Sequence, residues 1–281
     1  FFKCHNCSAS HNLANLIKLV DRPLYDQYIL ERYKGSKPAS EESLFERFKT
    51  DTKTKLKSTP LQGLKPFSNL NDEHPAKQYL LNRKLPTDYF DRLYYCDKFQ
   101  TYVNRIRPGT FESLNKKYEH PRLIIPFYDV DNQVFAIQGR AFGKEQPKYL
   151  TIKLQENKQK IFGLERINLH KRLYIVEGPL DSLFLDNCIA AGGADLQLPA
   201  ENKDVVFIFD NEPRNKEIID RMYKLIDKDY MIVIWPEGTK EKDINEMIIK
   251  GKTKEDLQKI ISDNTYSGLS ALTQLNSYKR I

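Results

Sequence analysis

Short apolar strand patterns alternate with helical patterns through the second half of the chain, and this alternation restricts the fold more than any other feature. Strands are predicted at 173–177, 189–192, 205–210 and 231–235, with helices at 179–186 and 217–226. Strands without polar alternation are buried on both faces, and strands joined by helices run parallel. The sequence therefore predicts a mixed α/β fold, with a parallel sheet flanked by helices on both faces.

Acidic residues follow several of these strands. Glu177 ends the first strand, Asp210 ends the third, and Glu212 comes two residues later. Asp243 lies after the fourth strand, where a helix begins. Because the carboxyl ends of parallel strands open at one edge of the sheet, we expect these side chains to gather there. Mg²⁺ or Mn²⁺ is the natural partner for such a set, although each acid taken singly is more simply a helix or turn cap.

Charge is divided unevenly along the chain. The net charge is +7, but residues 1–160 carry 28 basic and 18 acidic side chains, against 17 and 20 in residues 161–281. A basic part beside a slightly acidic part suits a protein that holds a polyanion with one and cations with the other. Since no apolar run approaches the ~20 residues of a membrane span, we expect a soluble, intracellular protein without membrane contact.

The cysteines do not form a disulfide framework in a chain of 281 residues, which fits a reducing compartment. Cys4 and Cys7 form a CxxC pair, which is half of a structural zinc site, an incidental pair or a redox motif. Because the chain begins at Phe1 rather than Met, we expect preceding residues, with a second such pair among them. Cys96 and Cys188 are expected to be buried thiols.

Residues 66–160 combine helical and strand patterns. Helices are predicted at 72–82 and 86–93, and paired strands at 122–128 and 134–140. Basic residues stand at the ends of these strands, namely Arg122, Arg140 and Lys148.

The C-terminal part is predicted to be helical. Helices are expected at 243–249 and at 253–261, the latter opened by a cap in which Thr253 is followed three residues later by Asp256. A stripe of Leu269, Leu272 and Leu275 predicts a further helix packed on the core.

Seven segments carry a resemblance to a known family. Three lie in the acidic part: Val176-Glu-Gly-Pro-Leu-Asp-Ser-Leu, Phe209-Asp-Asn-Glu-Pro-Arg-Asn and Lys242-Asp-Ile-Asn-Glu-Met-Ile, which together resemble the Toprim fold. Four lie in the basic part: Pro121-Arg-Leu-Ile-Ile-Pro, Gln138-Gly-Arg-Ala, Pro147-Lys-Tyr-Leu-Thr-Ile and Ile161-Phe-Gly-Leu-Glu-Arg. In their order along the chain, the seven segments resemble the DNA primases of T-even-type bacteriophages, which are DnaG-like, Toprim-containing enzymes.

The resemblance implies a division of the chain into five parts. They are the C-terminal part of a zinc-binding module (1–33), a linker (34–65), a basic N-terminal subdomain of the RNA polymerase core (66–165), a Toprim subdomain (166–250) and C-terminal helices (251–281).

The resemblance also implies roles for individual residues. The expected acidic catalytic residues are Glu177, Asp181, Asp210, Glu212 and Asp243, of which Glu177, Asp210 and Glu212 would hold Mg²⁺ or Mn²⁺. The expected template and nucleotide contacts are Arg122, Arg140, Lys148 and, less directly, Lys160, while Tyr149, Tyr102 and Phe99 are candidates for stacking on bases. Cys4 and Cys7 would bind Zn²⁺ if the missing ligands precede them. Asn245 stands where many bacterial relatives carry Asp.

The implied activity is metal-dependent synthesis of short RNA primers from ribonucleoside triphosphates on single-stranded DNA, for lagging-strand replication. The implied partners are the template, the nucleotides, the RNA primer and a hexameric replicative helicase, in the cytoplasm of an infected bacterial cell. Two alternatives remain at this point: a Toprim nuclease that uses the same acids, and a non-catalytic primosome scaffold that binds single-stranded DNA.

Overall fold

The computed structural model describes residues 60–112, 119–191 and 204–281, together with scattered positions between Phe2 and Tyr28. The chain divides into two units, Phe1–Glu46 and Arg47–Ile281. In the first unit, β1 (Phe2–Lys3) pairs antiparallel with β2 (Ser10–His11). The candidate zinc ligands Cys4 and Cys7 and most of the expected linker lie outside the described residues, so these remain predictions.

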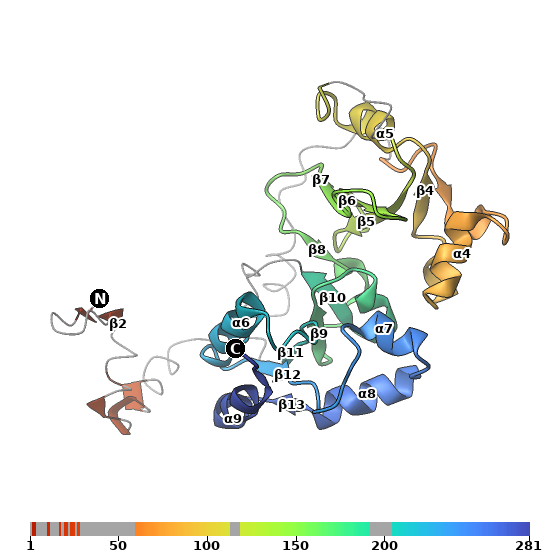
Figure 1. Cartoon of the computed structure of the whole chain (residues 1–281). Coiled ribbons are helices and arrows are strands. Elements are labelled where there is room, and N and C mark those ends of the chain that lie inside the picture. Colours follow the sequence, from red (N-terminus) through yellow and green to blue (C-terminus); the bar gives the residue numbers. More distant parts are fainter. Residues whose placement is uncertain are drawn as a thin grey trace. The chain divides into compact units, whose positions relative to one another are not determined.

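The second unit contains two sheets, which Figure 1 shows as separate layers. The first is an antiparallel sheet in the order β3-β4-β5-β6-β7. Its strands are β3 (Lys65–Pro66), β4 (Tyr94–Cys96), β5 (Arg122–Tyr128), β6 (Val134–Ala141) and β7 (Tyr149–Lys153). Its helical elements are η1 (Phe67–Asn69), α4 (Pro75–Asn82), η2 (Thr87–Tyr89) and α5 (Phe99–Ile106). The expected β5–β6 pair is confirmed, and every residue of both strands is buried.

Two helical elements of this region differ from expectation. The helix expected at 86–93 is only the 3-10 turn η2, because the chain must already extend into β4 at Tyr94. The helix α5 was not predicted, and it buries Phe99 and Tyr102, with 1% and 5% of their surface exposed. A Cβ atom on Gly139 of β6 would lie 2.3 Å from the Phe99 ring, so this glycine makes room for it. Phe99 and Tyr102 are therefore core residues rather than free stacking platforms.

The second sheet has the order β13-β12-β11-β9-β10-β8. Its strands are β8 (Ile161–Phe162), β9 (Leu173–Val176), β10 (Cys188–Ala191), β11 (Val205–Phe207), β12 (Met231–Val233) and β13 (Thr265–Tyr266). The four central strands are parallel, as predicted. The edge strands β8 and β13 run antiparallel and were not predicted, because two residues are too few to set up a pattern.

Helices lie on either flank of the second sheet. They are α6 (Lys216–Ile226), α7 (Ile244–Ile249), α8 (Lys254–Asp263) and α9 (Gly268–Tyr278), with the 3-10 turn η4 at Leu164–Arg166. Figure 1 shows α6 and α9 on one flank and α7 and α8 on the other. The cap of α8 by Thr253 and Asp256 is confirmed. In the leucine stripe of α9, Leu275 is fully buried, whereas Leu269 is 79% exposed and does not reach the core.

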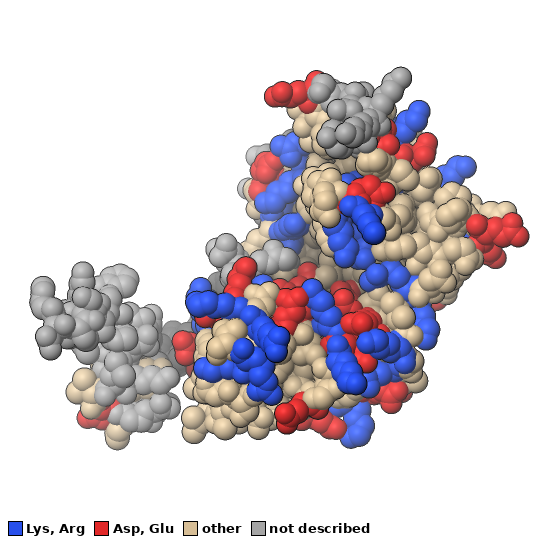
Figure 2. Space-filling view, viewed as in Figure 1, with Lys and Arg blue, Asp and Glu red and all other residues tan. Residues whose placement is uncertain are grey.

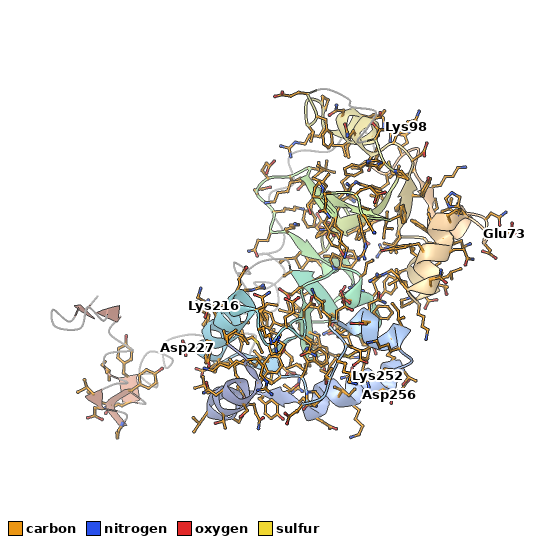
Figure 3. The ribbon with its side chains drawn as sticks, viewed as in Figure 1. Glu73, Lys98, Lys216, Asp227, Lys252 and Asp256 are labelled. Carbon is orange, nitrogen blue, oxygen red and sulfur yellow. The ribbon has the colours of Figure 1, made fainter. Side chains whose placement is uncertain are left out.

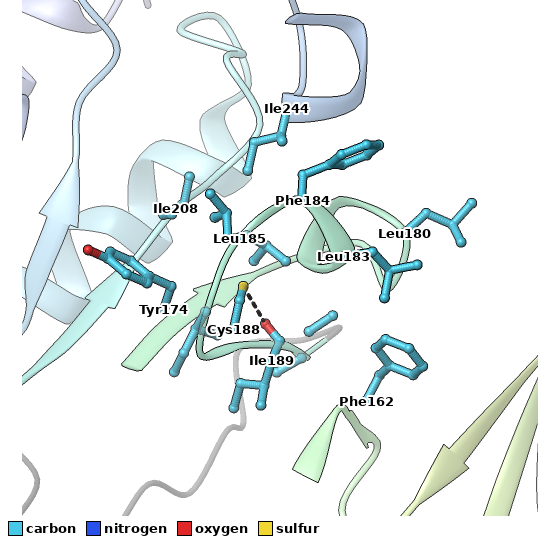
Figure 4. Packing of buried hydrophobic residues seen from close by; sticks show 14 of the residues in the cluster. Phe162, Tyr174, Leu180, Leu183, Phe184, Leu185, Cys188, Ile189, Ile208 and Ile244 are labelled. Carbon is cyan, nitrogen blue, oxygen red and sulfur yellow. Dashed lines mark hydrogen bonds between the residues drawn. The ribbon is translucent and has the colours of Figure 1, made fainter. Parts of the chain in front are cut away.

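The segment after β9 is the 3-10 turn η5 (Asp181–Phe184), not the α-helix expected at 179–186. The chain is extended again at Leu185 because β10 begins at Cys188, which leaves no room for an α-helix. Figure 4 shows Phe184 of this turn on the side of Ile244 of α7, and Leu183 on the side of Phe162. This apolar packing holds Asp181 of the turn close to the start of α7.

The buried thiols expected at Cys96 and Cys188 are confirmed, and burial raises the pKa of each to about 12. Among the helices of the described residues, none combines the length and apolar character that crossing a bilayer requires.

Candidate active site

Acidic side chains meet at the carboxyl edge of the second sheet. Glu177 directly follows β9, Asp210 lies three residues after β11, and Asp181 belongs to η5. Asp243 is the N-cap of α7, where its Oδ1 accepts a hydrogen bond of 2.7 Å from the Glu246 amide. Asp243 is therefore a helix cap, and it also lies at this edge of the sheet.

The pKa values of two acids record how much negative charge collects here. Burial raises the pKa of Asp210 to about 7, helped by the charges of Glu177, Asp181 and Asp243. Burial and the charge of Asp243 raise the pKa of Asp181 to about 6, although the Asn245 amide donates to its Oδ1 at 3.1 Å. We call these four residues the acid edge: Glu177, Asp181, Asp210 and Asp243. The structure thus brings these four predicted acids together.

Glu212 is paired with a counter-charge, Lys242. Its carboxylate lies 2.5 Å from Lys242 Nζ and accepts a hydrogen bond of 2.7 Å from Asn215 Nδ2. These two contacts hold its pKa below the usual value. Lys242 also lies 3.9 Å from Asp210, so one ammonium group serves both acids.

A second basic residue compensates Glu177. Arg221 of α6 donates from Nη1 to Glu177 Oε1 at 2.6 Å, while Glu177 Oε2 lies 3.5 Å from the Asp210 amide. Figure 2 shows Lys and Arg side chains standing among Asp and Glu on this part of the molecule. Sequence reasoning missed both cations. Lys242 directly precedes Asp243, so its place in that segment was an available signal, whereas nothing marked Arg221 among the charges of α6.

The carboxylate oxygens of this region suit a hard divalent cation, but among the described residues they are not arranged as a set of metal ligands. Carboxylate oxygens are the ligands that Mg²⁺ prefers. Within the three long described stretches, no group of three His, Cys, Asp or Glu side chains is arranged to hold a metal ion. Lys242 and Arg221 instead supply the positive charge nearest to the acids.

Arg122, one of the basic residues expected to contact the template, lies inside the first sheet. Only 4% of it is exposed. Its Nη1 donates to the carbonyls of Gly139 at 3.1 Å and Pro147 at 3.0 Å, and its guanidinium lies 5.2 Å from the centre of the Phe99 ring. Its hydrogen bonds therefore hold β5, β6 and the segment before β7 together.

Arg140 faces the acid edge. Its Nε donates to the Tyr79 hydroxyl at 3.0 Å, its Nη1 donates to the Tyr149 hydroxyl, and its charge lowers the pKa of Asp181. Arg83, at the end of α4, acts on Asp181 in the same way and lies over the Tyr79 ring at 5.7 Å. Sequence reasoning missed Arg83 and Tyr79, because only the fold brings α4 beside the acids.

Lys148 and Lys160 are separate from this cluster. Lys148 is exposed and lies 5.7 Å from the centre of the Tyr149 ring, which is itself 40% exposed. Burial, with repulsion from Lys153, lowers the pKa of Lys160. Of the three stacking candidates, Tyr149 alone has a large exposed surface.

Comparisons with known proteins place this arrangement in a family. No protein-family model matches the chain. The DNA primase of Enterobacteria phage T4 is 35% identical over 285 residues, which cover 99% of this chain and 81% of that protein.

Solved structures resemble the fold. The DnaG primase catalytic domain bound to single-stranded DNA superposes with a TM-score of 0.52 at 18% identity, over 78% of this chain and 77% of that one. The catalytic core of Escherichia coli primase gives 0.51 at 19% identity, over 78% and 79%. On the strength of the sequence match to the phage enzyme, the chain belongs to the DNA primases, the nucleotidyltransferases that synthesise RNA primers for DNA replication.

Proposed function

We propose that the acid edge, with Glu212, is the Toprim-type catalytic centre where this primase joins ribonucleoside triphosphates. The observation that carries the proposal is the placement of four acids after β9, in η5, after β11 and at the start of α7. The pKa of Asp210, which burial and three neighbouring acids raise to about 7, supports it. Carboxylates that repel one another in this way are stabilised by a cation, and phosphoryl transfer is the chemistry that such a cation serves. The proposal gives a common role to acids that come from four different segments.

Glu177, Asp210 and Glu212 would hold Mg²⁺ or Mn²⁺. Bound there, the ion would supply charge neutralisation for the triphosphate and acidify the attacking hydroxyl. Lys242 and Arg221 would act as counter-charges of these acids. Because Lys242 is 55% exposed on a flexible stem, it is free to leave Glu212 when another cation arrives.

The chain's own residues would position the nucleotides. Arg140 and Arg83 both contact Tyr79 and act electrostatically on Asp181, and such guanidinium groups can hold phosphate oxygens. The Nε atom of Arg83 is buried and, within the described stretches, has no hydrogen-bond partner. Such a donor is available to an anion. Glu177 is held by Arg221 and is placed either to take the proton of the 3′-hydroxyl or to bind the ion.

Single-stranded DNA is the proposed template. Lys148 and Lys160 would contact its phosphates, and Tyr149 would stack on an unpaired base. Arg122 would act on the template only through the strands that it holds. Binding that depends on such phosphate contacts weakens steeply as salt is added.

The remaining parts of the proposal follow from the family resemblance. They comprise the five-part division of the chain, zinc held by Cys4 and Cys7 together with further ligands, a hexameric replicative helicase as partner, and action in the cytoplasm of the infected bacterium.

The test is primer synthesis by the double variant Asp210→Ala plus Glu212→Ala, on single-stranded DNA with Mg²⁺ and the four ribonucleotides. We expect no oligoribonucleotide product, with Asp256→Asn as a matched control that removes a carboxylate from the cap of α8 and keeps activity. Primer synthesis by the double variant at the wild-type rate would contradict the proposed centre. Cleavage of the DNA by the wild-type protein, without nucleotide addition, would favour a Toprim nuclease.

A further inference from the structure

Asn245 is a fully buried polar residue beside the acid edge, with none of its surface exposed. It lies in the first turn of α7, two residues after Asp243. Burying an amide side chain is unfavourable unless its polar atoms are satisfied, so its contacts show what the residue does.

Asn245 joins three segments that are distant in sequence. Its backbone amide donates to Asp181 Oδ1 at 3.1 Å, which fixes that carboxylate against α7. Its side-chain Nδ2 donates to the backbone carbonyl of Arg83 at 2.7 Å, and Arg83 is the C-cap of α4. The amide therefore connects the acid edge directly to the end of a helix from the first-sheet region.

A second contact strengthens the same joint. Lys84, the residue after Arg83, donates from Nζ to the carbonyl of Ile248 at 3.1 Å, near the other end of α7. The end of α4 is thus held at both ends of a single short helix. Both contacts are partly buried, although Asn245 itself is buried and Lys84 is exposed.

The hydrogen bond from Nδ2 requires a donor, which distinguishes asparagine from aspartate at this position. An aspartate oxygen there would face the Arg83 carbonyl, acceptor against acceptor, and would add a negative charge beside Asp181 and Asp243. The Oδ1 atom of Asn245 is buried and finds no hydrogen-bond partner within the described stretches. Of the two polar atoms of this amide, the donor Nδ2 is therefore the one that makes a hydrogen bond.

We infer that Asn245 is a positioning residue that clamps the end of α4 to α7 and so holds the Arg83 guanidinium beside the acid edge. The inference rests on the proposed function, since it assigns Arg83 a place next to the nucleotide phosphates. The clamp fixes the spacing between the groups that hold the triphosphate and the carboxylates that hold the ion. Small errors in such spacing are costly to the rate and to binding.

The test compares Asn245→Asp, which keeps the shape but removes the donor, with Asn264→Asp. Asn264 also donates from Nδ2 to a carbonyl, that of Ile260 within its own helix, so it is a matched control outside the joint. The first readout is hydrogen–deuterium exchange of the Lys84 and Leu85 amides, which donate to Leu81 and Leu80. We expect exchange to rise about tenfold in Asn245→Asp and to stay unchanged in Asn264→Asp.

The second readout is primer synthesis, with KM for the ribonucleotides and kcat measured separately. The clamp predicts a rise in KM of about tenfold, larger than the change in kcat, because a guanidinium that contacts substrate is displaced. Lys84→Met removes the contact between Lys84 and the Ile248 carbonyl, so it should change both readouts in the same direction by a smaller factor. It also keeps the inference testable if Asn245→Asp fails to fold.

Two results would overturn the clamp. Unchanged exchange at Lys84 and Leu85 in Asn245→Asp would mean that the amide does not hold α4. A lower Mg²⁺ requirement with unchanged KM would mean that this position serves as a ligand for the ion. The exchange readout needs no activity, so failure of the clamp is distinguishable from failure of the catalytic centre, which the Asp210 and Glu212 double variant tests.

Discussion

The acid edge and Arg122 are both charged and partly or wholly buried, yet they differ in how their charges are satisfied. Arg122 donates to two backbone carbonyls and lies against an aromatic ring, so its charge is used within the first sheet. At the acid edge the carboxylates repel one another, and the pKa of Asp210 rises to about 7. A charge that is satisfied within the protein holds the fold, whereas carboxylates that repel one another are stabilised by a nearby cation.

The largest expected effect tests the Arg122 side of this comparison. Arg122→Met removes the donor from the carbonyls of Gly139 and Pro147, of which the Gly139 carbonyl lies in a buried contact. We expect a loss of about 3 kcal/mol in the free energy of unfolding. Urea denaturation measures it. A change within about 0.5 kcal/mol, the usual range for a surface substitution, would show that the guanidinium is not a structural group.

The next effect concerns the geometry of the acids. A Cβ atom on Gly178 would lie 2.4 Å from Asp181 Oδ2, and Asp181 cannot move freely because the Asn245 amide holds its other oxygen. Gly178→Ala should therefore lower kcat for primer synthesis roughly a hundredfold. In the control Gly143→Ala, the new Cβ meets the flexible side chain of Glu145, and activity should persist. Equal activity of the two variants would show that the position of Asp181 does not matter for catalysis.

The pH dependence of stability tests the repulsion itself. Asp210 has a pKa of about 7 in the folded chain and an ordinary value of 3.8, so the folded state binds more protons between these values. Its contribution to stability must therefore fall as pH rises from about 4 to about 7. Asp210→Asn removes this loss. Its melting temperature should exceed that of the wild type at about pH 8 but not at about pH 4, without divalent ions. A difference independent of pH would contradict the repulsion.

The smallest expected effect concerns the internal counter-charge. Lys242→Met removes an ammonium that competes with a divalent ion for Glu212, so the Mg²⁺ concentration for half-maximal synthesis should fall about threefold. Lys216→Met is the control, because Lys216 pairs with Asp220 on the exposed face of α6. Figure 3 labels the position of Lys216. An equal change in both variants would reflect net charge alone.

The sequence predicted the parts of the fold that have strong local signals. The apolar strands β9, β11 and β12, the helix α7 and the cap of α8 follow from hydrophobic patterns and from Thr253 and Asp256. The sequence did not predict η5 as a 3-10 turn, because the early start of β10 overrides a helical pattern. It also did not predict α5, because the residue that makes room for Phe99 of this helix is Gly139, which belongs to β6.

The site shows the same division. The acids of the edge were expected together because parallel strands deliver their ends to one side. The basic residues near these acids were not predicted, namely Arg221, Lys242 and Arg83. The fold brings them to Glu177, Glu212 and Asp181, respectively. Arg122 and Arg140 look alike at strand ends, and only the three-dimensional contacts separate a structural arginine from one that faces the acids.

Binding of Mn²⁺ to the protein without nucleotide or DNA tests the central claim most directly, because it asks whether the repelling acids take up a cation. Electron paramagnetic resonance at about pH 8, where Asp210 is mostly ionised, would measure the affinity of the wild type, of Asp210→Asn plus Glu212→Gln, and of Asp256→Asn. We predict that the double variant binds Mn²⁺ at least about tenfold more weakly, while Asp256→Asn binds it like the wild type. Equal affinity of all three proteins would contradict the claim that the acid edge is the cation site.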